Sequence, residues 1–102
     1  MNDPGRDRRE LKTRYGEAYV RLSAILFSED PIGINFEENA DEYEPEVGTI
    51  LPRLQGCRDP QDVQRIVHEE FVRWFDPSTA GQADRYRRIA ERIWAEVMPR
   101  LE

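Results

Sequence analysis

The spacing of the apolar residues constrains this chain more than any other feature of its sequence. From position 6 to position 28, apolar side chains recur at steps of three and four residues, which is the period of one face of an α-helix. The segments 45–55, 60–75 and 80–98 repeat this pattern. Short helices are marginal in water unless their apolar faces pack together. The sequence therefore predicts an all-α fold, with four helices in a compact, bundle-like arrangement.

The Asp-Pro pairs at 30–31 and 59–60 mark predicted helix boundaries. The helix over 6–28 must stop near Asp30, because the residue before a proline avoids the α region, and the stretch "DPIG" (30–33) is typical of a tight turn. Asp59 and Pro60 have the residue types of a capping acid and a first helical residue. We therefore expect a new helix to begin at position 60.

The other helix boundaries are less regular. Pro52 lies inside the helix expected over 45–55, which predicts a kink or two short pieces, because its ring presses on the carbonyl four residues back. Asp76 and Pro77 should end the third helix. Thr79 and Gln82 have the spacing of a capping box for the last helix.

Size and composition indicate one domain and exclude several protein classes. A chain of 102 residues can build a single core, so we expect one helical domain over 1–102. The first ten residues lack the pattern of a secretory signal, and apolar runs are too short to cross a membrane, so we expect a cytoplasmic protein. A single cysteine, Cys57, excludes an internal disulfide and a multi-cysteine zinc site. We expect no cofactor.

The negative charge is concentrated in the long loop expected over 29–44, between the first two helices. Residues 29–46 contain eight acids and no base, whereas the whole chain has a net charge of −6. A concentrated negative field attracts basic proteins or cations and repels the nucleic acid backbone. Nucleic acid is therefore an unfavourable ligand.

This loop is either a solvated surface loop without a binding role or a binding segment, and among binding roles we favour the binding of a protein. Dense carboxylates around an aromatic anchor complement an arginine- and lysine-rich surface, as in small inhibitor or immunity-type proteins. The candidate partner-binding residues are Glu37, Glu38, Asp41, Glu42 and Tyr43.

The alternative is a divalent-metal or small-ligand site in the same loop. Its carboxylate and amide oxygens are hard enough for calcium. However, no register of residues 30–46 supplies the alternating ligands, central glycine and final glutamate of a helix-loop-helix calcium site. We therefore assign no residue as a metal ligand.

Enzymatic activity is not expected. Cys57 and the single histidine, His68, could serve as nucleophile and base, but no oxyanion-hole motif or orienting third group accompanies them. Glu70 lies close to the apolar face that holds Val67 and Trp74, and we expect its carboxylate to reach an arginine or an indole N–H at the edge of the core.

A second apolar face on the first helix suggests self-association. Val20, Ala24 and Phe27 lie opposite the face expected to join the core. A homodimer contact would cover them.

Several short motifs resemble a family of short bacterial proteins, domain of unknown function 1871. The resemblance covers roughly residues 20–98 and rests on "DPIG", "DEYEPEV", "RDPQDVQRIVHEEF" and "RRIAERI", in that order. This chain differs in a longer acidic loop before Tyr43 and in the prolines Pro45 and Pro52. The resemblance implies a compact all-helical fold and a bacterial source, and it supplies no activity.

Overall fold

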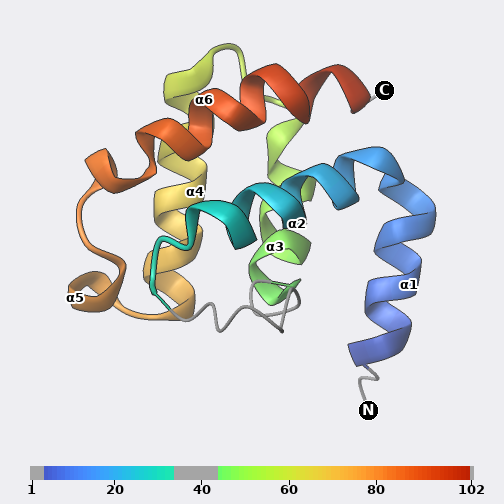
Figure 1. The fold of residues 1–102 in the computed structure, drawn as a ribbon, viewed down its shortest axis with the longest axis horizontal. Coiled ribbons are helices and arrows are strands. Elements are labelled where there is room, and N and C mark those ends of the chain that lie inside the picture. Colours follow the sequence, from blue (N-terminus) through green and yellow to red (C-terminus); the bar gives the residue numbers. More distant parts are fainter. Residues whose placement is uncertain (1–3, 34–43, 102) are drawn as a thin grey trace.

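The computed structural model describes residues 4–33 and 44–101, and this part of the chain is helical with no strand (Figure 1). The expected all-α class is confirmed. The expected count of four helices is not, because the described residues form six α-helices and two short 3₁₀ helices. These are α1 (Pro4–Tyr15), α2 (Glu17–Glu29), α3 (Glu44–Leu54), α4 (Pro60–Trp74), α5 (Pro77–Ala80), η1 (Ala83–Tyr86), α6 (Arg87–Glu96) and η2 (Met98–Arg100).

The helices cross one another in two directions. In Figure 1, α2 and α6 run across the view, whereas α3 and α4 run steeply to them. Helix α6 packs against both α2 and α4, and α3 packs against α4. The radius of gyration is 12.8 Å, close to the value of about 13 Å expected for a compact domain of 100 residues.

The predicted helix over 6–28 is two helices, α1 and α2, separated at Gly16. Gly16 has φ 55° and ψ −120°, a conformation that is open to glycine and strained for other residues. Its N–H donates to the carbonyl of Lys12 at 2.8 Å and closes α1. Leu11 and Tyr15 of α1 pack against the same core as α2, so the apolar spacing continues across the break. The sequence pattern therefore gave no sign of it.

The core is built from the apolar faces of α2, α3, α4 and α6. One predicted core residue is not part of it, since Trp74 keeps 46% of its surface exposed. One unexpected residue is buried, the acid Glu46 near the start of α3. The largest fully buried side chains are Tyr19, Tyr86, Phe71, Leu22, Ile25, Leu26, Ile50, Leu51, Leu54, Ile89 and Ile93.

Proline has different effects on the two sides of the turn that connects α3 and α4. Helix α3 continues through Pro52, so of the two predicted outcomes, a kink or two short pieces, the second was wrong. Pro52 lies in the last turn, where the missing N–H removes one backbone hydrogen bond and only two helical residues follow. At the start of α4, the predicted cap is confirmed, because Asp59 Oδ1 accepts from the backbone N–H of Asp62 at 2.9 Å.

The link between α4 and α6 differs from the prediction. Thr79 is not a cap for the last helix, because it lies inside the short helix α5, where Asp76 caps it. The carbonyls at and after α5 are held by side chains from other elements. Arg85 donates to the carbonyl of Thr79 at 2.9 Å, the Tyr86 hydroxyl to that of Ala80 at 2.6 Å, and His68 Nε2 to that of Gly81 at 2.9 Å.

None of the helices in residues 4–33 and 44–101 is long and apolar enough to cross a bilayer.

Candidate functional site

The predicted partner-binding residues lie outside the part of the chain that the structure describes. Glu37, Glu38, Asp41, Glu42 and Tyr43 all fall between the two described ranges. The structure does describe the turn that leads into this segment and the helix that follows it.

The turn that leads into the acidic segment is fixed to the helical framework. Asp30 ends α2 in the left-handed conformation, and its carbonyl accepts from the N–H of Gly33 at 3.2 Å, which confirms the predicted turn. Arg85 of η1 donates to the carbonyl of Pro31 at 3.2 Å, and Ile32 packs against the core. The segment therefore departs from a defined position on the fold.

The main charged cluster in the described residues joins α3 to α4 through Arg53. Arg53 Nη1 lies 2.8 Å from Glu70 Oε2, and Nη2 lies 2.7 Å from Glu69 Oε1. Arg73 adds a longer contact to the same Glu70 oxygen at 3.4 Å. Glu70 is only 1% exposed, so two guanidinium groups compensate a buried carboxylate. The expectation that Glu70 reaches an arginine is confirmed.

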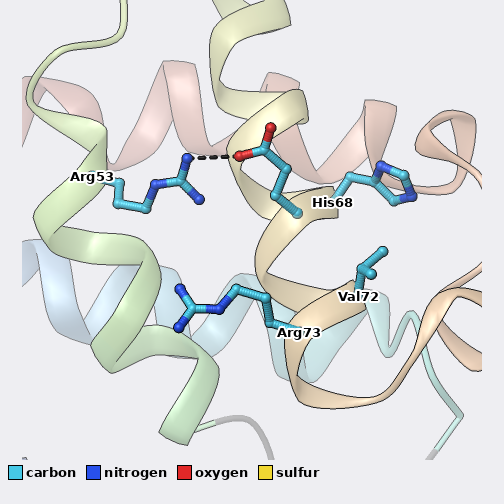
Figure 2. Close-up of a pocket in the computed structure, with 5 residues that line it drawn as sticks. Arg53, His68, Val72 and Arg73 are labelled. Atoms are coloured by element: carbon cyan, nitrogen blue, oxygen red, sulfur yellow. Dashed lines mark hydrogen bonds and ion pairs between the residues drawn. The ribbon is translucent and has the colours of Figure 1, made fainter.

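An open pocket of about 480 Å³ lies beside this cluster (Figure 2). Arg53 and Glu69 line it together with His68, Val72 and Arg73. Figure 2 shows Arg53 reaching from α3 toward α4, and Arg73 reaching from α4 toward α3, while His68 points to the other side of α4. Both nitrogens of Arg53 that face the cluster are engaged, so this arrangement clamps two helices together.

The electrostatics of the cluster agree with a role in holding α3 and α4 together. The hydrogen bond from Arg53 holds the pKa of the Glu69 carboxyl below its usual value. Glu69 also contacts Arg65, one helical turn away, at 3.4 Å. The carboxylate is therefore stabilised in its charged form, which is unsuited to a general acid near neutral pH.

In the described part of the chain, the His68 side chain bonds a backbone carbonyl rather than Cys57. His68 Nε2 faces the carbonyl oxygen of Gly81, and since a carbonyl only accepts, this nitrogen carries a proton. Burial raises the pKa of the Cys57 thiol, which disfavours the thiolate needed for nucleophilic attack. Among residues 4–33 and 44–101, no group of three or more histidine, cysteine, aspartate or glutamate side chains could hold a metal ion.

A second ion cluster ties α2 to α6. Glu29 Oε2 lies 3.1 Å from Arg92 and 3.3 Å from Arg88. Arg92 also contacts Glu96 at 3.2 Å on its own helix. Sequence inspection missed this cluster, because Glu29 and Arg92 are 63 positions apart.

The apolar residues on the outer face of α2 differ in exposure. Val20 is 53% exposed and Ala24 is exposed, while Phe27 is half-buried. The side of α2 opposite its core face is thus partly exposed to solvent, as the sequence predicted.

Comparisons with family models, with curated proteins and with solved structures gave no match. The resemblance to domain of unknown function 1871 stays an expectation. The class that the structure defines is a small, compact all-helical domain, whose described charged clusters join helices to one another.

Proposed function

We propose that this protein is a non-enzymatic protein-interaction module that binds a basic protein through its acidic segment, residues 35–46. Glu37, Glu38, Asp41 and Glu42 supply the charge, and Tyr43 supplies an aromatic anchor. An inhibitor or immunity-type protein that acts in the bacterial cytoplasm is the role that fits best.

The distribution of charge supports this proposal. In the framework, Glu69 and Glu70 pair with Arg53, and Glu29 pairs with Arg92. Four acids and no base lie between Gly33 and Glu44, and the other 17 acids nearly balance the 15 bases. Most of the net charge of −6 therefore comes from ten residues, and a local field of this kind steers a basic partner toward its source.

Affinity capture with charge-matched variants tests the proposal. The wild-type protein, immobilised and exposed to a bacterial lysate, should retain a basic protein that elutes with rising salt, because the Debye length shortens to about 3 Å at 1 M. Asp41→Asn combined with Glu42→Gln should lose most of this retention. Asp84→Asn combined with Glu91→Gln removes the same charge from exposed positions on η1 and α6 and should retain the partner.

The same experiment contains the outcome that rejects the proposal. Equal retention by both double variants, with unchanged helical circular dichroism, would mean that the acidic segment is not the interface.

We further propose that the outer face of α2 supports a homodimer. Val20 is one of two large apolar residues in the described chain that are strongly exposed, and Ala24 and Phe27 lie beside it on the helix. Val20→Glu should convert a dimer to a monomer in analytical ultracentrifugation. A wild-type protein that sediments as a monomer at high concentration contradicts this proposal.

A further inference from the structure

A single residue, Gly16, separates α1 from α2. Helical hydrogen bonds reach it from both sides, since its N–H donates to the Lys12 carbonyl at 2.8 Å and its carbonyl accepts from the N–H of Val20 at 3.3 Å. The bend is made at Gly16 itself, with φ 55° and ψ −120°, and no side chain caps the start of α2. A helix that continued through Gly16 would give the first N–H groups of α2 the carbonyl partners of a regular helix.

Helix α1 covers the fold from the outside. In Figure 1 it lies at one edge of the molecule, at a steep angle to α2. Leu11 and Tyr15 pack against the core and are only half-buried, while positions 12–14 between them are exposed. Leu11 meets α3 closely, because a Cβ atom added at Gly48 would lie 3.2 Å from Leu11 Cδ1. We call the surface of α2 and α3 that Leu11 and Tyr15 cover the α1 site.

The apolar residues of α1 and α2 also suit a straight arrangement. Leu11, Tyr15, Ala18 and Leu22 follow one another at steps of four, three and four, so in a continuous helix they would share one face. A straight helix would carry α1 away from its own α1 site and leave that site empty. A second copy of the chain could then fill it with the same two side chains, whose fit the monomer already shows.

We propose that two copies of this chain exchange α1. In the dimer, Gly16 takes helical angles, α1 and α2 form one helix, and α1 of each copy packs in the α1 site of the other. The exchanged contacts equal those of the monomer, so relief of two bends opposes the entropy lost on association. A short hinge under strain favours such an exchange. This dimer does not use Val20 on the outer face of α2, so the inference goes beyond the proposed function and is independent of it.

An alanine at the hinge tests the exchange. All variants carry Val20→Glu, which removes the outer-face contact, and sedimentation equilibrium measures their association. Alanine is strained at positive φ and favours a helix, so Gly16→Ala should raise the dimer association constant by at least about thirtyfold, because each dimer relieves two hinges. Gly56→Ala, where φ is not positive and a Cβ meets nothing within 4 Å, should leave it unchanged. A folded Gly16→Ala protein that stays monomeric overturns the inference.

A distance within one chain shows whether α1 has been exchanged. Thr13 on α1 and Gln55, one residue past α3, are exposed and can carry spin labels as Thr13→Cys and Gln55→Cys, with Cys57→Ser removing the native thiol. Labelled chains are refolded with a large excess of unlabelled chains, so that a dimer holds at most one labelled copy. Because α1 packs on α3 in the monomer, double electron–electron resonance should give a longer distance in the dimer fraction. A dimer that keeps the distance of the monomer overturns the inference.

A longer hinge guards against a Gly16→Ala chain that fails to fold. The protein with its native hinge and Val20→Glu, refolded at high concentration, should contain a dimer fraction. Three glycines inserted after Gly16 let α1 reach its own site without a strained residue, so they should remove that fraction. A native hinge that gives no dimer under these conditions, or a dimer fraction that the insertion leaves unchanged, overturns the inference.

Discussion

Arg53 and Glu70 form a 2.8 Å ion pair that joins a partly exposed guanidinium on α3 to a carboxylate buried on α4. A carboxylate with 1% exposure would be costly without a cation, and the adjacent Arg73 contacts it only at 3.4 Å. Arg53 therefore compensates the buried charge of Glu70 where α3 packs on α4.

Loss of Arg53 should destabilise the fold. Arg53→Met should lower the free energy of unfolding by about 2 kcal/mol, because the buried carboxylate keeps only the weaker Arg73 contact. Urea denaturation measures the change. Arg65→Met, which removes the exposed contact to Glu69 at 3.4 Å, should cost less than about 0.5 kcal/mol. Equal costs for the two variants would contradict the assigned role of Arg53.

The stability of the protein should fall in acid, in part through Glu69. Its pKa in the folded state is depressed below the usual value of 4.5 by the Arg53 hydrogen bond, so the unfolded chain binds this proton more tightly. The contribution of Glu69 is thus complete above pH 4.5 and is lost as the pH falls through the folded pKa. Urea midpoints measured between neutral and acidic pH should fall less steeply in Arg53→Met than in the wild type. A parallel fall in both would reject this coupling.

Gly16 and Gly56 form a matched pair for testing backbone strain. A Cβ atom would meet nothing within 4 Å at either site, but only Gly16 has a positive φ. Gly16→Ala should lower the free energy of unfolding by about 1 to 3 kcal/mol, whereas Gly56→Ala should change it by less than about 1 kcal/mol. Thermal melts followed by circular dichroism compare the two, and a similar loss in both would mean that φ at Gly16 is not the cause.

Cys57 should behave as a protected thiol. Burial raises its pKa, so at neutral pH the thiolate is scarcer than in an unfolded chain. Alkylation by iodoacetamide at pH 7.5 should be slower in the native protein than in urea. A native rate above the denatured rate would revive the nucleophile hypothesis that the position of His68 argues against.

Divalent cations should leave the stability unchanged if the acidic segment binds proteins only. A specific ligand at one hundred times its dissociation constant adds about 2.7 kcal/mol to stability. Thermal melts in millimolar calcium or magnesium, compared with melts in the chelator EDTA, measure this directly. A clear upward shift that disappears in Asp41→Asn would favour the metal-binding alternative.

Local sequence signals predicted the helical class and many helix boundaries. The turn at Asp30 and the cap at Asp59 depend on side chains and prolines within four positions, so short-range chemistry is enough to predict them. The break at Gly16 was missed because a hydrophobic period continues across it, and the period reports which face is buried rather than whether the backbone turns.

Long-range contacts account for what the sequence could not predict. Periodicity indicated that Glu70 approaches the core, but it could not choose between an arginine and an indole as the partner. The structure assigns Arg53 to Glu70 and gives the Trp74 indole to Thr49, 25 positions away. Trp74 was predicted to be buried because it lies on the apolar stripe of α4. It is the last residue of that helix, however, and 46% of its surface stays exposed.

The loop at α5 has a consequence for the order of folding. Its three side-chain contacts join residues only 6 to 13 positions apart, whereas Glu29 and Arg92 must meet across 63 positions. Contacts close in sequence form faster than distant ones, because less chain entropy is lost when the intervening loop closes. The second half of the chain can therefore assemble around α4 first. Helix α2 can then pack against this assembled part.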